Sequence, residues 1–289
     1  MRVFSIDLDG KPFIEPIYST RQFRVVFSTA MNYTDNLAML DLAIYNLSQS
    51  TNIDSGKSIV FKAGYEGTGD SFQTIFKGRV TTVFKERDGA NVVTRILCRA
   101  GTVDDRASKD LTLGRNATCT QVLDAIGNTF GVRIEYQKEQ FEGANNTIFY
   151  RGLSLKGDIR HQLDSLAQQC KFSWAHDGTK VVIDKDDKKR TGFVQEVSLL
   201  TGLIGVPEAS ADNRGVFVNV TTTLNPVLRL GDLFNLKSQY ATFNTGNMYL
   251  IPPEHGGNLD GEYKIQTISH EGDSWGDIWR TKVTGIKNV

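Results

Sequence analysis

Short runs of alternating apolar and polar residues fill residues 23–99, and no other feature constrains the fold of this chain as strongly. Leu40, Leu42 and Ile44, for example, alternate with Asp41 and Tyr45. Side chains of a strand point alternately to its two faces, so each run predicts a strand with one face in a core. The pattern recurs at Phe23, Val25 and Phe27, at Ile59, Phe61 and Ala63, and at Val80, Thr82 and Phe84. With turn-forming residues between the runs, it predicts a compact antiparallel barrel or sandwich.

Composition places the chain among ordinary globular proteins. The chain has 289 residues, which is long enough for two or three domains, each with its own hydrophobic core. Its content of 39% hydrophobic and 23% charged residues is typical of a globular protein. The formal net charge of zero removes the usual electrostatic footprint of a nucleic-acid-binding protein. The chain has three widely spaced cysteines, Cys98, Cys119 and Cys170. An odd number at such spacing argues against a disulfide framework and for synthesis in a reducing compartment.

The sequence gives no sign of a membrane segment or a leader. No apolar run approaches the roughly 20 residues that span a bilayer. The first residues, MRVFSIDLDGKPF, lack the apolar centre of a secretory signal. We therefore expect neither feature.

Changes in periodicity divide the chain into three regions. Residues 1–108 are rich in strand patterns and end in the polar stretch TVDDRASKD. Residues 109–192 mix helical and strand patterns, and residues 193–289 return to strands. We predict a mainly β fold in which two β-barrel domains flank a small α+β insert.

The insert carries clear helix signals. Thr118 and Gln121 have the spacing of a capping box, and Gly131 is suited to a left-handed stop. Apolar residues at helical spacing follow each of two helix starts: Val122, Leu123, Ile126 and Phe130 in the first, and Ile159, Leu163, Leu166, Ala167 and Cys170 in the second. Asp177-Gly178 predicts a hairpin turn between the two strands that follow.

Polar and glycine-rich stretches punctuate the rest of the chain. The run DKDDKKR at residues 184–190 is predicted to be a solvated linker. In the third region, GLIGVPEASADNRG and NTGNMYLIPPEHGGNLDG are predicted to be long loops that are functional, disordered or ordered only by a partner.

No arrangement of residues predicts catalysis or metal binding. The four histidines, His161, His176, His255 and His270, have no compact metal spacing. Cys170 with His176 is conceivable as a thiolate pair, but a core cysteine beside a turn histidine is the favoured interpretation. His270, Asp273 and Asp277 would suit an acid–base or metal set, yet polar residues are expected in that turn.

The sequence disfavours a pair of carboxylates for glycoside hydrolysis. Glu135, Glu139 and Glu142 lie in a polar stretch that offers no apolar pocket to raise a pKa. We predict no catalytic, cofactor-binding or metal-binding site and no enzyme activity.

Several strings resemble baseplate hub proteins of contractile-tailed bacteriophages. LDLAIYNLS, GKSIVFKAGY and IFKGRVTTVFKERDG, with Ile75 and Phe76 before Gly78, resemble the family's N-terminal barrel. LNPVLRLGDLFNLKS and EYKIQTISHEGDSWGDIWRTKVTGI are similar to its later strands and their glycine-aspartate turns. The family is related to late-control protein D and to the base of the type VI secretion spike, and the resemblance is weakest over residues 109–192.

The resemblance implies a structural role. Such hubs resemble three-fold rings in which each chain supplies two tube-like barrels, so that six barrels match a hexameric tail tube on one side and a trimeric spike on the other. It implies a homotrimer that contacts the tail tube protein, the spike protein and other baseplate proteins, with DNA passing through the lumen. The implied location is the virion tail baseplate, with assembly in the host cytoplasm.

Apolar residues in glycine-rich stretches are the predicted interface, and the alternative is that these loops fold back on their own barrel. They are Leu203, Ile204, Gly205, Val206, Met248, Tyr249, Leu250 and Ile251, with Trp275 and Trp279 as further anchors. Tyr45, Asn46, Leu47 and Tyr65 are interpreted as turn and core determinants. Alternative functions are a carbohydrate-binding or cell-wall-acting tail module, or the hub of a phage-derived contractile injection system.

Overall fold

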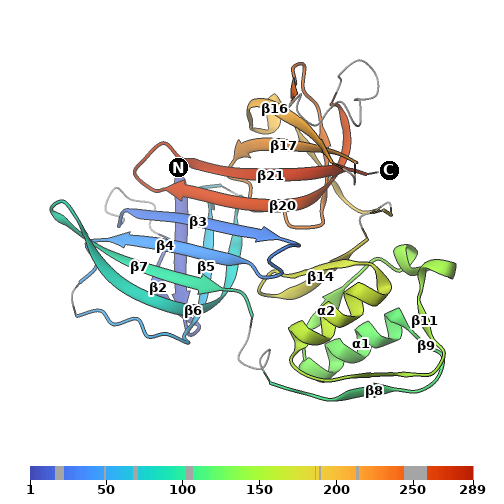
Figure 1. The fold of residues 1–289 in the computed structure, drawn as a ribbon. Helices are drawn as coiled ribbons and strands as arrows, with labels where there is room; N and C mark the ends of the chain where they lie inside the picture. Colours follow the sequence, from blue (N-terminus) through green and yellow to red (C-terminus); the bar gives the residue numbers. More distant parts are fainter. Residues whose placement is uncertain are drawn as a thin grey trace.

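The computed structural model describes residues 1–16, 23–48, 50–67, 71–101, 107–185, 187–188, 190–212, 215–243 and 259–288. A 14-stranded sheet dominates it, with a smaller unit of two helices and short strands to one side (Figure 1). The mainly β fold with an α+β insert is therefore confirmed. No helix within the described residues is long and apolar enough to cross a membrane.

The strands of the first region form one half of the large sheet. They are β1 (Arg2–Leu8), β2 (Lys11–Ile14), β3 (Val25–Asn32), β4 (Met39–Tyr45), β5 (Ser58–Tyr65), β6 (Phe72–Asp88) and β7 (Asn91–Arg99). Their hydrogen-bonded order is β3-β4-β7-β6-β5-β1-β2. The predicted inward residues Leu42, Ile44, Ile59 and Phe61 are each fully buried, so the alternation identified one face of these strands correctly.

Two runs of the first region depart from their pattern. Phe23, predicted to point inward, lies before β3 and is 41% exposed. The register of β6 against β7 shifts between Val80 and Thr82. Val80 is 2% exposed, but Phe84 is 38% exposed and Thr82 is also on the surface. The prediction that all three share the core face was wrong, because a bulge residue reverses the faces beyond it.

The third region supplies the other half of the sheet. It contains β15 (Val194–Val197), the 3-10 turn η4 (Leu199–Thr201), β16 (Leu203–Asp212), β17 (Gly215–Thr223), β18 (Leu233–Leu236), β19 (Thr242–Phe243), β20 (Gly261–Asp273) and β21 (Trp279–Lys287). The order is β19-β16-β17-β21-β20, with β18 beside β20 and β15 beside β18.

The two halves meet at β3 and β20, which pair antiparallel from Thr267 with Asn32 to Asp273 with Val26. In Figure 1 the blue strand β3 lies directly beside the red strand β20. Phe27 of β3 packs edge-on against Phe61 of β5 and Trp279 of β21, at centroid distances of 4.8 and 5.2 Å. The two strand-rich regions therefore share one sheet and one hydrophobic cluster.

The insert has its own core. Its elements are β8 (Leu111–Leu113), β9 (Ala117–Thr118), α1 (Cys119–Phe130), β10 (Arg133–Glu135), η2 (Lys138–Phe141), η3 (Gly143–Asn145), β11 (Ile148–Phe149), β12 (Leu153–Leu155), α2 (Ile159–Cys170), β13 (Ser173–His176) and β14 (Lys180–Asp184). The Thr118–Gln121 capping box and the left-handed Gly131 are both present, as predicted. The apolar faces of α1 and α2 share a buried cluster with Trp174 and Ile183.

The hairpin between β13 and β14 attaches the insert to the first region. His176 exchanges backbone hydrogen bonds with Asn36 and Ala38, of 2.8 and 3.1 Å. At the hairpin turn, Gly178 approaches β6 so closely that a Cβ there would lie 1.8 Å from the carbonyl oxygen of Lys77. Glycine is required at this position both for its φ of +91° and for that approach.

A buried ionic cluster attaches the insert to the third region. Lys264 of β20 lies 2.8 Å from Asp184 at the end of β14, with side chains 1% and 0% exposed. Arg190, whose side chain is 6% exposed, lies 3.6 Å from Asp184. Gln140 Nε2 donates to Asp184 at 2.9 Å. The prediction that residues 184–190 form a solvated linker was wrong at both ends, since Asp184 and Arg190 are buried. The partner that allows this burial is the Lys264 ammonium of β20, which is far away in the sequence.

We expect Lys264→Met to destabilise the fold strongly. Removing one partner of a buried pair leaves an uncompensated charge and typically costs about 3–5 kcal/mol. Denaturant unfolding measures the change. The matched control is Lys156→Met, which removes an exposed ion pair to Asp110 and should leave the midpoint unchanged. Equal midpoints for the two variants would contradict the structural role of the cluster.

His270 is buried on β20, where its Nδ1 lies 2.8 Å from Thr281 Oγ1. Burial, aided by the charge of Arg229, lowers the pKa of His270 to about 3. In the unfolded chain the imidazole returns to its ordinary pKa of about 6.5. Between those values only the unfolded chain takes up the proton, so stability falls as the pH falls.

We therefore expect wild-type stability to drop between about pH 6.5 and pH 3, with His270 contributing up to about 1.4 kcal/mol per pH unit. His270→Asn keeps a polar atom near Thr281 but cannot titrate there. Its unfolding free energy, measured over this range, should fall less steeply than that of the wild type. Parallel profiles would refute the assignment.

Candidate assembly surface

The predicted interface residues Leu203, Ile204, Gly205 and Val206 begin strand β16. Leu203 is buried at 7% exposure, whereas Ile204 and Val206 are 44% and 50% exposed. A register shift between Ile204 and Glu208 interrupts pairing with β17, and Gly205 has a φ of +73°. The loop prediction was wrong because this irregularity breaks the alternation that identifies a strand. Two side chains of the four are accessible to a partner.

The turn before β16 exposes two leucines that periodicity did not identify. Leu199 and Leu200 of η4 are 80% and 95% exposed. The sequence did contain a sign of this exposure, namely two adjacent leucines just before Gly202. In a strand, alternation would bury one of two adjacent leucines and expose the other, so a pair in a turn can be exposed together. Leu199, Leu200, Ile204 and Val206 are called the apolar patch below.

Polar contacts fix the conformation of η4. The Ser198 backbone N–H donates to Thr201 Oγ1 at 2.8 Å, and the Leu203 N–H donates to the Ser198 carbonyl at 2.9 Å. Lys237 donates to Glu196 at 2.6 Å, and hydrogen bonds from Lys237 and Ser198 lower the pKa of Glu196. A turn that is already ordered loses little entropy when its leucines bind a partner.

The two tryptophans lie in different environments. Trp279 is 3% exposed, packs on Phe27 and donates its indole N–H to the Gly64 carbonyl at 3.2 Å. It is a core residue, and its prediction as an interface anchor was wrong. Strand alternation at the start of β21 turns it inward. Trp275 is 68% exposed in the turn between β20 and β21.

Two arginines of the first region hold the Trp275 turn. Arg2 donates to the carbonyls of Gly276 and Asp277, the latter at 3.0 Å. Arg24 pairs with the Asp273 carboxylate at 2.8 Å. Although partial burial opposes the shift, the Arg24 hydrogen bond lowers the pKa of Asp273. The turn thus presents Trp275 in a fixed position beside the junction of the two halves.

The remaining predicted interface positions, Met248, Tyr249, Leu250 and Ile251, lie outside the described residues, as does His255.

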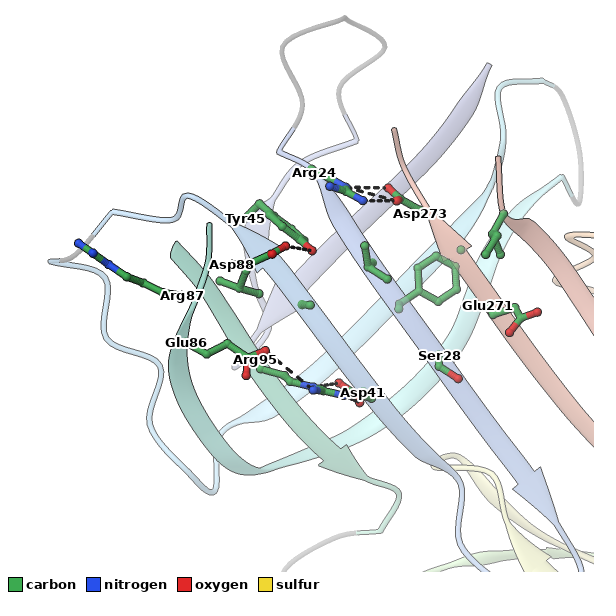
Figure 2. Close-up of a pocket in the computed structure, with 16 residues that line it drawn as sticks. Arg24, Ser28, Asp41, Tyr45, Glu86, Arg87, Asp88, Arg95, Glu271 and Asp273 are labelled. Carbon is green, nitrogen blue, oxygen red and sulfur yellow. Dashed lines mark hydrogen bonds and ion pairs between the residues drawn. The ribbon is translucent and has the colours of Figure 1, made fainter. Parts of the chain in front are cut away.

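A depression of about 510 Å³ on the sheet surface adjoins this turn, with Asp273 and Ile278 among its lining residues. Figure 2 shows two ion pairs on its wall: Arg24 with Asp273, and Arg95 with Asp41 at 2.5 Å. Tyr45 lies 4.6 Å below the Arg24 guanidinium and donates to Asp88 at 3.4 Å. Five carboxylates and three arginines line the depression, so it offers a charged, polar surface beside the turn that carries Trp275.

The acid–base candidates occupy separate places. Asp273 is paired with Arg24 on the surface, whereas His270 is buried against Thr281. Glu135 binds Lys180 at 2.8 Å, while Glu139 and Glu142 are exposed. His176 Nδ1 accepts the Gly178 N–H at 2.9 Å. Over the part of the chain that the structure describes, no three metal-ligating side chains cluster.

Comparison with known proteins gave one matching family and several solved structures with a similar fold. The family model "Baseplate hub gp41" matches residues 34–251. No curated protein matches the sequence. The fold resembles the 43 kDa tail protein of prophage MuSo2 from Shewanella oneidensis, with a TM-score of 0.62, 11% identity and coverage of 100% of this chain and 99% of that one.

Two further structures share the fold. A tail protein from Neisseria meningitidis gives a TM-score of 0.60 at 9% identity, covering 99% of this chain and 97% of its own. A type VI secretion component from E. coli, described as similar to the phage tail proteins gp27 and gp5, gives 0.57 at 10% identity, covering 98% and 77%. The family match spans most of the chain. The chain therefore belongs to the baseplate hub gp41 family and is a structural protein of the phage tail.

Proposed function

We propose that the protein forms a homotrimeric ring in a contractile-tail baseplate, joins the tail tube to a trimeric spike and lets DNA pass through its lumen. Membership of the baseplate hub family carries this proposal. The similarity of the E. coli type VI component to gp27 and gp5 supports a partner on the spike side. Assembly in the host cytoplasm, before release in the virion, is part of the same proposal.

The pairing of β3 with β20 supports the proposed symmetry. Each chain contributes two groups of antiparallel strands, joined edge to edge in one sheet. Three such chains would present six strand groups, the number needed to face a hexameric tube. A head-to-tail contact between copies closes into a ring when the rotation fits.

We further propose that the apolar patch and Trp275 are contact points within this assembly. Exposed leucines on an ordered turn have no folding role that would explain them, and large exposed apolar groups commonly mark interfaces. The polar depression beside Trp275 would then form part of the rim around that anchor.

The test is the mass of the protein in solution, measured by light scattering after size exclusion. The wild type is expected to give three times its chain mass of 32.1 kDa. Leu199→Ser combined with Leu200→Ser should shift the trimer–monomer equilibrium at least tenfold toward monomer. It should keep the wild-type Tm, because both side chains are almost fully exposed.

Tyr150→Ser is the matched control, since Tyr150 is 71% exposed on the insert, away from the patch. It should leave the trimer intact. A double variant that assembles as the wild type does would eliminate the patch, and a wild type that stays monomeric up to high concentration would contradict the self-assembling ring.

We also propose that the protein has no catalytic activity. A zymogram on peptidoglycan should show no clearing, and a cleared band from the pure protein would overturn this.

A further inference from the structure

Two of the three cysteines meet inside the insert. Cys119 is the first residue of α1 and Cys170 is the last residue of α2, and they are 0% and 2% exposed. Both belong to the buried cluster that packs the two helices together, and their side chains hydrogen-bond to each other. The third cysteine, Cys98, lies in the separate core of the large sheet.

The surroundings of the pair favour ionisation of one thiol. Hydrogen bonds from Cys119 and Thr147, with the charge of Lys185, lower the pKa of Cys170, although burial opposes the shift. The same contact raises the pKa of Cys119. Lys185 is held in place by a 2.7 Å hydrogen bond from its Nζ to the Asn145 carbonyl. At Cys98, by contrast, burial raises the pKa to about 12. A thiolate is the reactive form of cysteine.

We propose that Cys119 and Cys170 form an oxidation site, which closes to an intramolecular disulfide when the assembled tail meets peroxide outside the reducing cell. The Cys170 thiolate attacks one oxygen of hydrogen peroxide, giving a sulfenic acid and hydroxide. The Cys119 sulfur then attacks the Cys170 sulfur, the S–O bond breaks, and water leaves with the Cys119 proton. In total, two thiols and one peroxide give one disulfide and two waters.

The site suits a small oxidant and a short movement. Hydrogen peroxide is close to water in size, so brief local opening of the insert admits it where larger disulfide reagents are excluded. The sulfur atoms move from hydrogen-bond contact to a bond of about 2.05 Å. The bond would join the start of α1 to the end of α2 and so constrain the unfolded insert.

In the experiment, the full chain is treated with hydrogen peroxide and denatured, and its free thiols are alkylated. Mass spectrometry then gives the number of alkyl groups and the mass of the protein. Untreated protein should take three alkyl groups. Oxidised protein should take one, carry a mass loss of about 2 Da, and yield a single cross-linked peptide containing both cysteines. Its Tm should rise by roughly 5 °C and return to the starting value after dithiothreitol.

Variants separate this site from general oxidation. Cys98→Ser is the matched control and should still lose two reactive thiols. Cys119→Ser and Cys170→Ser should each abolish the cross-link. Wild-type or C98S protein that keeps both insert thiols, gains oxygen without a cross-link or forms disulfides only between chains would overturn the proposal. These outcomes do not depend on the ring, because the pair lies within one chain.

Discussion

The fold depends on the pairing of β3 with β20, two strands from opposite ends of the chain whose paired residues include Asn32 with Thr267. This ladder joins the strands of the first region to those of the third. Phe27 and Trp279 meet across it in one core. Without it, β3 and β20 would each be an open edge with unsatisfied backbone groups, and each half would be prone to pair with other chains. With it, the molecule presents two strand groups in a fixed relation.

The insert is held to this sheet from both sides. On one side the Gly178 turn fits against β6, where no side chain can be accommodated. On the other, Asp184 binds Lys264 in the interior. A buried ion pair contributes little net stability compared with apolar packing, but it strongly disfavours arrangements that leave either charge unpaired. The two contacts therefore set the position of the insert more than they strengthen the fold.

Polar contacts also position two exposed apolar turns on the surface. Arg2 and Arg24 of the first region fix the turn that carries Trp275, which belongs to the third. Lys237 and Glu196 fix the turn that carries Leu199 and Leu200. In both places polar contacts inside the chain hold an apolar group out in solvent. A monomer gains nothing from that arrangement, whereas a structural protein that assembles with partners gains ordered contact points.

Local sequence determined most of the secondary structure. Alternation placed Leu42, Ile44 and Phe61 inward, and the Thr118 capping box, Gly131 and the Asp177-Gly178 turn fixed the insert elements, because these depend on contacts only a few residues apart. Tertiary structure decided the rest. The bulges at Val80 and Ile204, the burial of Asp184 and the inward position of Trp279 all depend on partners distant in sequence. A local pattern cannot reveal a partner strand, and the partner strand determines which side chains are buried and which remain exposed.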